Sequence, residues 1–332
     1  MTQPKELLDP ELAVPLEGFL AATGGGFDLG DVSGARRIVD GVIEAVKAQA
    51  PAIEGIETRD VDVPGHGNAP PVRVRVYRPS GRAEALPAIL WMHPGGWVLG
   101  SIDLDGLTAA QLAKAAECVA VSVEYRLAPE HPFPAALHDC YAALAWLGRE
   151  SAALGVDPTR IAVGGSSAGG NLAAALSLMA RDEGGVQPAF QLLVYPALDD
   201  RTAAEASESR PETLFWSRRN GLDAWTAYLG KQPGGDDVSP YAAPSRARDL
   251  SGLPPAYIAT GALDAFLDEN IDYARRLLAA GVPAELHVYP GACHAFDVFG
   301  AGSRIGQQFI AEREAVLRRA LHPALQSPSP AA

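Results

Sequence analysis

The chain has 332 residues, 48% of them hydrophobic, and a formal net charge of −13. This length and composition fit one large domain or two medium ones with a buried core, and an acidic chain without any basic cluster argues against nucleic acid as a partner. No run of 18 apolar residues occurs and the first residues, MTQPKELLDPELAVP, lack the apolar centre of a signal peptide, so we expect a cytoplasmic protein with no membrane partner.

Helical patterns occupy residues 1–50, where the segment ATGGGFDLGDVSG interrupts them. Two segments then alternate apolar and polar residues, ETRDVDV (57–63) and PVRVRVY (71–77). Strict alternation is typical of half-exposed antiparallel strands. We therefore predict a helical N-terminal segment followed by two such strands.

From residue 87 onward the strand patterns change character. Short β-rich runs, several of them almost wholly apolar, alternate with helical patterns; they are PAILWMH (87–93), CVAVSVEY (118–125), RIAVGG (160–165), FQLLVYP (190–196), PAYIATG (255–261) and AELHVYP (284–290). Buried strands that alternate with helices indicate a mainly parallel sheet covered on both faces. The predicted fold class is therefore α/β.

Two further segments lie outside this alternation. About 50 residues between LVYPALDD and LPPAYIATG have no strand signal, and they contain ETLFWSRRNGLDAWTAYL (212–229), which has helical spacing. Together with the N-terminal helices, this insertion is expected to form a cap. The last segment, LHPALQSPSPAA, is rich in Pro, Ser and Ala and is expected to fray.

The stretch GGSSAGG (164–170) lies between a predicted strand and a predicted helix. In that context G-x-S-x-G forms a tight turn that presents its serine above the sheet edge. Ser167 is the central serine of the motif, whereas Ser166 would need a glycine where Ala168 stands. Ser167 is thus the candidate nucleophile, and the alternative is a turn of small residues that only lets a helix pack closely on the sheet.

A serine hydroxyl needs a base to take its proton, and three histidines follow Ser167 in the chain. His287 lies within a strand pattern and His322 within the tail that is expected to fray. His294, in PGACHAFD, follows the last strand on a loop. We therefore predict His294 as the base, with an ordinary loop histidine as the alternative.

The base needs an acid that orients it, and in α/β-hydrolases this acid lies between serine and histidine in the chain. Asp264 directly follows a strand, at the edge of a parallel sheet where ligands bind. Its alternative role is the N-cap of the next helix. Asp199 and Asp200 also follow a strand and are the weaker candidates, while Asp268 and Glu269 fit favourable charges in the first turn of a helix.

Acyl transfer also requires N–H donors for the oxyanion. In LWMHPGGWVLGS, Gly95 and Gly96 offer backbone N–H groups after a buried strand, and Ala168 offers that of the residue after the serine. The alternative is a plain glycine loop. Four large aromatic residues fit either a substrate pocket or the core, namely Trp97, Phe215, Trp216 and Trp225.

Four segments in this order, HPGGWVLGS, YRLAPEHPFPAAL, GGSSAGGN and DAFLDE…YPGACHAF, resemble the hormone-sensitive-lipase family of α/β-hydrolases. The resemblance spans residues 55 to about 320. It implies an eight-stranded, mostly parallel sheet flanked by helices, with the second strand antiparallel and a helical cap. It also implies Ser167, Asp264 and His294 as a catalytic triad, with oxyanion donors at Gly95, Gly96 and Ala168.

Two positions depart from the family pattern. Pro94 stands where the oxyanion loop usually has a glycine, and Ser166 stands where an acidic residue often precedes the nucleophile. Neither departure removes a catalytic group. In YRLAPEHP, the family implies that Arg126 and Glu130 belong to a supporting network and do not react.

The expected protein is a serine carboxylesterase that hydrolyses short-to-medium acyl esters through an acyl-enzyme. Its expected partners are small-molecule esters, and a homodimer is the candidate assembly. The expected division is cap helices 1–50, a catalytic domain 51–322 with the cap insertion at about 203–245, and a disordered tail 323–332. The three cysteines lack metal-ligand spacing and fit free thiols, so no metal or other cofactor is expected. Alternatives are an amide or formamide hydrolase on the same triad and an inactive ligand-binding receptor, a class that typically lacks the histidine.

Overall fold

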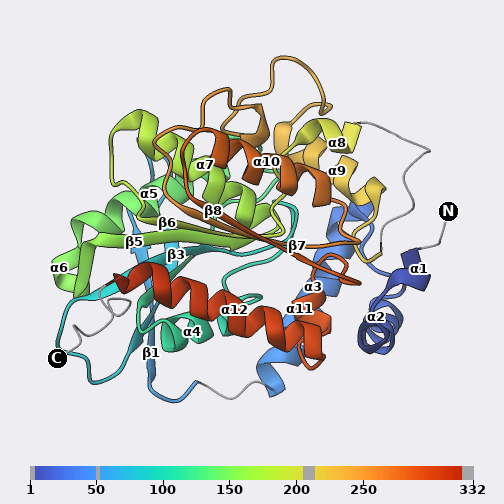
Figure 1. The fold of residues 1–332 in the computed structure, drawn as a ribbon, viewed down its shortest axis with the longest axis horizontal. Coiled ribbons are helices and arrows are strands. Elements are labelled where there is room, and N and C mark those ends of the chain that lie inside the picture. The colour runs from blue at the N-terminus through green and yellow to red at the C-terminus, as the bar shows by residue number, and fades with distance from the viewer. Residues whose placement is uncertain (1–3, 50–52, 205–213, 324–332) are drawn as a thin grey trace, which may run out of the picture.

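The structure, a computed structural model, describes residues 4–49, 53–204 and 214–323. At its centre is an eight-stranded sheet with the order β1-β2-β4-β3-β5-β6-β7-β8 (Figure 1). The strands are β1 (Ile56–Val63), β2 (Val72–Pro79), β3 (Leu86–Met92), β4 (Val119–Val123), β5 (Val156–Ser166), β6 (Phe190–Val194), β7 (Ala256–Gly261) and β8 (Ala284–Tyr289).

The strands with alternating sequence patterns pair antiparallel, and the strands with apolar patterns pair in parallel with one another. The alternating strands β1 and β2 pair antiparallel, and β2 also pairs antiparallel with β4. All other neighbours pair in parallel, and every residue of β3, β4, β6 and β7 is buried. The expected mostly parallel sheet with a reversed second strand is therefore confirmed.

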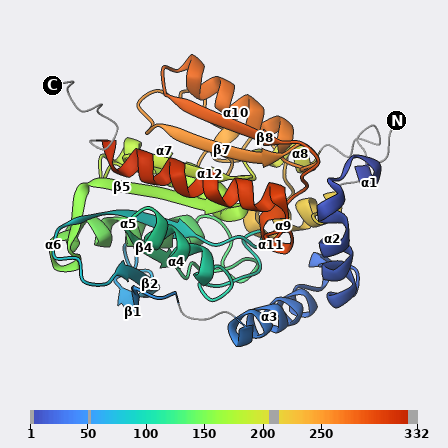
Figure 2. The same ribbon diagram turned by 60° about the horizontal axis from the view of Figure 1, so that its bottom comes forward.

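Helices cover both faces of the sheet (Figure 2). They are α1 (Pro4–Leu7), α2 (Pro10–Ala22), α3 (Val32–Gln49), α4 (Gly106–Ala115), α5 (Ala135–Arg149), α6 (Ser151–Leu154), α7 (Ala168–Glu183), α8 (Asp200–Ala204), α9 (Arg218–Leu229), α10 (Leu267–Ala279), α11 (Phe296–Phe299) and α12 (Arg304–Leu321). Two 3₁₀ turns add η1 (Leu29–Asp31) and η2 (Pro244–Arg246).

The sheet separates two apolar cores. Successive side chains of a strand point to opposite faces, so Leu90 and Met92 of β3 join one core with α5, α7 and α10, while Ile89 and Trp91 join the other with α4 and α12. Both faces of β3 are thereby covered, and this strand leads directly into the glycine loop at residues 94–96.

The N-terminal helices and helices α8 and α9, which follow β6, lie at the same end of the molecule (Figure 1). Asn220 of α9 joins them, since its side chain donates to the carbonyl oxygen of Phe27 at 2.9 Å and accepts from the Leu29 N–H at 3.4 Å. The rings of Phe19 and Phe215 add a contact with centroids 5.1 Å apart. These two parts of the chain thus form one layer, which we name the end layer (α2, η1, α3 and α9).

The C-terminal end of the described chain differs from the expectation in one respect. Helix α12 includes Leu321, and His322 Nε2 lies 2.8 Å from the carbonyl oxygen of Ala116. That hydrogen bond attaches His322 to the turn before β4, so the prediction that this histidine frays is wrong. The remaining expected tail, from residue 324 onward, lies outside the described residues. No helix in the described part of the chain has the length and apolar character needed to span a membrane.

Candidate active site

Ser167 lies at the turn between β5 and α7, with φ 57° and ψ −117°. A positive φ is uncommon for a residue with a side chain and indicates strain held by the surroundings. Two glycines permit this turn. A Cβ on Gly165 would lie 2.4 Å from the Gly169 carbonyl carbon, and one on Gly169 would lie 2.1 Å from the Met92 carbonyl oxygen. The motif therefore requires glycine at both positions, and it places Ser167 above the sheet edge.

The side chains of Ser167, His294 and Asp264 form a chain of hydrogen bonds. His294 Nδ1 lies 2.8 Å from Asp264 Oδ2, and His294 Nε2 lies 2.9 Å from Ser167 Oγ. A carboxylate only accepts hydrogen bonds, so Nδ1 carries the proton and donates to Asp264. Nε2 is then the acceptor for the Ser167 hydroxyl, and all three residues are buried.

The carboxyl ends of parallel strands bring these distant residues together. Ser167 follows β5, Asp264 follows β7 and His294 follows β8. Asp264 Oδ1 accepts from the Phe266 N–H at 2.9 Å, which leaves Oδ2 for His294. Asp264 therefore also organises the turn before α10, although Phe266 and not Asp264 occupies the N-cap position.

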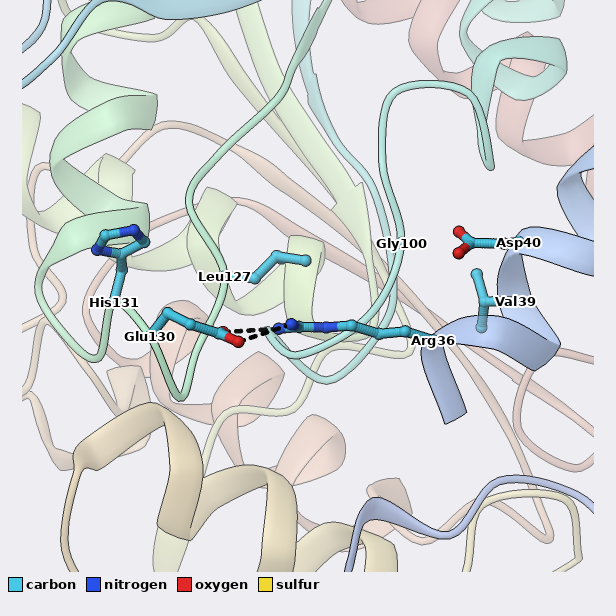
Figure 3. A pocket seen from close by; sticks show the side chains of 7 residues that line it. All are labelled: Arg36, Val39, Asp40, Gly100, Leu127, Glu130 and His131. Carbon is cyan, nitrogen blue, oxygen red and sulfur yellow. Dashed lines mark hydrogen bonds and ion pairs between the residues drawn. The ribbon is translucent and has the colours of Figure 1, made fainter. Parts of the chain in front are cut away.

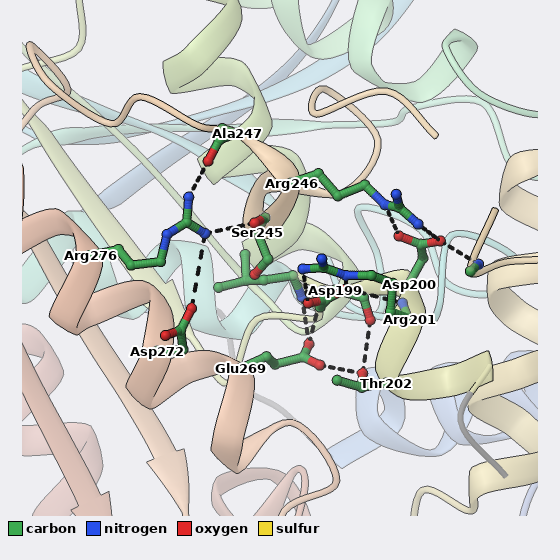
Figure 4. A network of polar contacts seen from close by, with 12 residues as sticks. Asp199, Asp200, Arg201, Thr202, Ser245, Arg246, Ala247, Glu269, Asp272 and Arg276 are labelled. Atoms are coloured by element: carbon green, nitrogen blue, oxygen red, sulfur yellow. Dashed lines mark hydrogen bonds and ion pairs between the residues drawn. The ribbon is translucent and has the colours of Figure 1, made fainter. Parts of the chain in front are cut away.

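Three of the other acidic residues weighed from the sequence, Asp199, Asp200 and Glu269, lie in a separate network (Figure 4). Asp199 binds Arg201 at 2.6 Å, and Asp200 binds Arg246 at 2.5 Å. Glu269 accepts from the Leu198 N–H at 2.6 Å, and burial raises its pKa well above the ordinary value. Each carboxylate thus fixes the segment after β6, and no hydrogen bond to His294 from any of the three is present among the described residues.

His287, which lies on β8, has hydrogen-bond partners other than Ser167. His287 Nε2 lies 2.9 Å from Glu285 Oε1, and His287 Nδ1 lies 3.2 Å from Glu312 Oε2. Together with the attachment of His322 to Ala116, this arrangement leaves His294 as the histidine that contacts Ser167.

In the loop after β3, hydrogen bonds to the carbonyl oxygens of Pro94 and Gly95 fix the orientation of the peptide groups. His93 Nδ1 lies 2.8 Å from the Pro94 carbonyl oxygen, and the Gly95 carbonyl accepts from the N–H groups of Val98 (3.1 Å) and Leu99 (2.8 Å). Burial lowers the pKa of His93 to about 4, so the ring is neutral near pH 7 and donates through Nδ1. The N–H of a trans peptide points opposite to its carbonyl, so the Gly95 and Gly96 N–H groups point away from these partners.

Three N–H groups near Ser167 are thereby left without an acceptor. No backbone hydrogen bond from Gly95, Gly96 or Ala168 occurs within the described part of the chain. Gly95 lines the cavity that contains Ser167, while Gly96 and Ala168 line a void of about 10 Å³ beside the same serine. The structure thus places all three predicted donor residues next to Ser167.

A cavity of about 290 Å³ contains the side chains of Ser167 and His294. Phe215 and Trp216 line it, in agreement with the pocket interpretation of these two residues. Most of its other lining is apolar and includes Phe19 of α2. The sequence pattern of an N-terminal helix carries no signal for such a distant contact, so Phe19 was not anticipated.

The other two residues of this group, Trp97 and Trp225, pack against Tyr228. Trp97 stacks on Tyr228 with ring centroids 4.3 Å apart and an interplanar angle of 7°, and Trp225 packs against both rings. Trp97 and Trp225 line the small void and not the larger cavity. The packing of Trp97 and Trp225 against Tyr228 favours the core interpretation for these two residues.

Six further polar residues of the cavity were also not anticipated from the sequence: Asp105, Thr108, Gln111, Tyr195, Asp297 and Arg313. Tyr195 follows β6, and its position at the carboxyl end of a parallel strand was the available signal. Arg313 is one of several arginines in α12, and its helical pattern does not distinguish it from exposed ones.

Arg36 of α3 connects the end layer to the loop that contains Glu130 (Figure 3). Its guanidinium binds both carboxylate oxygens of Glu130 at 2.8 Å and donates to the Val98 carbonyl at 3.0 Å. Arg126 makes a similar paired contact with the buried Asp139. Neither Arg126 nor Glu130 lines the cavity around Ser167, in keeping with a supporting role.

The described residues include no group of three or more His, Cys, Asp or Glu side chains arranged to hold a metal ion. The three cysteines are buried and unpaired. Ser167 shares a hydrogen bond with His294, and His294 shares one with Asp264. This arrangement can deprotonate a hydroxyl and stabilise the resulting negative charge.

Comparison with known proteins places the chain among hydrolases. Residues 89–298 match a family described as alpha/beta hydrolase fold. Carboxylesterase NlhH of Mycobacterium tuberculosis is 40% identical over 274 residues, which are 80% of this chain and 83% of that protein. An arylesterase of Saccharolobus solfataricus is 35% identical over 241 residues, 72% of this chain and 77% of that protein. A solved structure of a bacterial heroin esterase has 41% identity and a TM-score of 0.89, with 95% of this chain and 98% of that chain covered.

Proposed function

The chain belongs to the α/β-hydrolase fold family, among proteins similar to hormone-sensitive lipase, and from this membership we propose that it is a serine carboxylesterase. The observation that carries the proposal is the hydrogen-bond chain from Ser167 through His294 to Asp264, at 2.9 and 2.8 Å. Such a chain has one established use in acyl transfer, the activation of a serine hydroxyl. The class of substrate is a small carboxylic ester.

In the first step His294 Nε2 takes the proton of Ser167 while Oγ attacks the ester carbonyl carbon. The carbonyl π electrons move to oxygen and form a tetrahedral oxyanion. Asp264 stabilises the imidazolium that forms, because its Oδ2 accepts from Nδ1. His294 then gives its proton to the leaving alkoxide oxygen, so that the alcohol departs and an acyl-enzyme remains.

The oxyanion accepts hydrogen bonds from the N–H groups of Gly95, Gly96 and Ala168. These donors are suited to the role because no other acceptor competes for them within the described chain and the site is buried. Ala168 is also the first residue of α7, a helix of 16 residues, and its N-terminal partial charge favours an anion. Water activated by His294 then attacks the acyl carbon and releases the acid.

The cavity sets an upper limit on the substrate. A volume of about 290 Å³ is at the small end of the usual range of ligand sites, about 300–1,000 Å³. Phe19 of α2 in the end layer and Phe215, which lies just before α9, bound this space. We therefore assign the end layer as the cap of the enzyme and short-to-medium acyl esters as its substrates.

A fluorophosphonate probe and a panel of p-nitrophenyl esters test this proposal. The unmodified protein is expected to be labelled and to hydrolyse short esters, whereas Ser167→Ala is expected to do neither. Ser166→Ala is the matched control and is expected to retain both properties. Labelling of the Ser167→Ala variant would refute the nucleophile. Faster turnover of an amide than of the matched ester would assign the triad to amide hydrolysis instead.

A further inference from the structure

The cavity that contains Ser167 has a largely apolar lining. Besides the catalytic residues, its charged side chains are Asp105, Asp297 and Arg313, which we name the polar subsite, and Thr108, Gln111 and Tyr195 are its other polar lining residues. Tyr195 connects the polar subsite to the catalytic residues. The ring of Tyr195 packs against the His294 ring at 4.7 Å, and its hydroxyl donates to Asp297 Oδ1 at 2.7 Å. The polar subsite therefore lies one tyrosine side chain away from His294.

Asp105 presents an acceptor without a paired cation. It occupies the N-cap position of α4, yet it makes no capping hydrogen bond to a backbone N–H; its side chain instead accepts from Trp91 Nε1 at 2.6 Å and from the Thr108 side chain. No Lys or Arg forms an ion pair with it within the described part of the chain. Burial raises the pKa of Asp105 to about 6, while Arg313 is near enough to act in the opposite direction.

Arg313 presents donors that are only partly used. Its side chain is 2% exposed, its Nη1 lies 3.6 Å from Asp297 Oδ2, and Nε has no hydrogen-bond partner among the described residues. A buried N–H without an acceptor costs stability, because the donor has lost its hydrogen bonds to water. Arg313 is one of the residues that line the cavity, so a ligand group that accepts hydrogen bonds would complete its surroundings.

From these two observations we propose that the polar subsite binds a hydroxyl group of the ester substrate, which donates to Asp105 and accepts from Arg313. A hydroxyl supplies a donor and an acceptor on one atom, whereas an ammonium group only donates and a carboxylate only accepts. The hydroxyl is also neutral, so its transfer into an apolar cavity costs less than that of an ion. The substrate class is thus a hydroxylated ester. This inference deepens the proposed carboxylesterase function and depends on it.

The test compares esters that differ in one terminal group. For the acyl side we would use p-nitrophenyl esters of ω-hydroxy acids and the alkyl esters in which methyl replaces hydroxyl, at several chain lengths. For the alcohol side we would use ω-hydroxyalkyl butyrates and their alkyl counterparts. At one chain length on one of the two sides, kcat/KM for the hydroxyl ester is expected to exceed that for the methyl ester by about tenfold or more. Matched ammonium and carboxylate esters are expected to be slower than the hydroxyl ester.

Asp105→Asn is expected to reduce the hydroxyl-to-methyl ratio to within about twofold of one. Trp91 Nε1 still requires an acceptor, so the amide oxygen replaces Oδ2, and the NH₂ group that replaces Oδ1 cannot accept from the substrate hydroxyl. Each ratio is taken within one variant, so differences in the amount of folded enzyme cancel. Asp103→Asn is the matched control, since it removes the same charge from the same loop but Asp103 binds Arg75 at 2.6 Å and does not line the cavity. Its ratio is expected to equal that of the unmodified enzyme.

The outcomes separate the two proposals. Absence of turnover for every ester would refute the carboxylesterase function itself. Turnover with equal rates for hydroxyl and methyl esters, or with the fastest rate for the ammonium or carboxylate ester, would refute only the hydroxyl assignment. A preference that persists in Asp105→Asn would refute the part assigned to Asp105.

Discussion

Replacement of Asp264 by Asn tests the orientation of the base with the least change of shape. In the native site, Asp264 Oδ1 accepts from the Phe266 N–H at 2.9 Å and Oδ2 accepts from His294 Nδ1 at 2.8 Å. In Asp264→Asn the Phe266 N–H still requires an acceptor, so the amide oxygen takes the place of Oδ1 and the NH₂ group faces His294. Two N–H donors cannot face each other, and the imidazole proton therefore moves from Nδ1 to Nε2.

The consequence is that Nε2 presents a proton to Ser167 Oγ and cannot take one. The opposite amide orientation would leave the buried Phe266 N–H facing a donor, at a cost of about 1–3 kcal/mol. In serine proteases the same substitution lowers kcat by about four orders of magnitude through the wrong tautomer. We expect a comparable loss here, which corresponds to about 5 kcal/mol of transition-state stabilisation.

The assay is kcat and KM for p-nitrophenyl butyrate, with the rate of fluorophosphonate labelling as a second measure of serine activation. Both rates are expected to fall while KM changes little. Asp272→Asn is the control, because Asp272 lies on the outer side of α10 and binds Arg275 at 2.7 Å. Asp264→Asn with more than about a tenth of the native kcat would show that Asp264 does not orient the base.

Pro94, Arg246 and Asp105 lie outside the triad and each offers a separate test. Pro94→Gly is expected to change kcat less than about threefold, because proline has no N–H to donate to an oxyanion; a loss of about a hundredfold would mean that the loop position depends on the proline ring. Arg246→Leu is expected to lower the free energy of unfolding in urea by about 3–5 kcal/mol, because Asp200, whose side chain is 0% exposed, loses its ion-pair partner; a loss below about 1 kcal/mol would contradict this. For Asp105 the folded-state pKa of about 6 exceeds the ordinary value of 3.8, so the folded chain holds a proton that the unfolded chain releases. Stability relative to Asp105→Asn is therefore expected to fall by up to about 3 kcal/mol as pH rises from about 4 to 7, and a rise would refute the sign.

The sequence by itself determined the order of the helices and strands. It also determined which three residues, Ser167, Asp264 and His294, are joined by hydrogen bonds. Apolar strand patterns alternate with helical ones. Each pattern reflects which residues of one short segment are buried, so it can be recognised from that segment alone. Ser167 was distinguished from Ser166 by the spacing of Gly165 and Gly169, since only glycine fits where their Cβ atoms would meet backbone. Asp264 and His294 were identified because residues that follow parallel strands share one edge of the sheet.

Only the tertiary structure decided which side chains surround that edge. Phe19 of the first long helix and Arg313 of the last helix line the same cavity as Ser167, although most of the chain separates them. Phe215 and Trp216 line the cavity whereas Trp97 and Trp225 pack beside it, and sequence composition does not distinguish the two pairs. The physical reason is that a strand or helix pattern fixes which face of an element is buried, while the partner of each buried side chain depends on how distant elements pack.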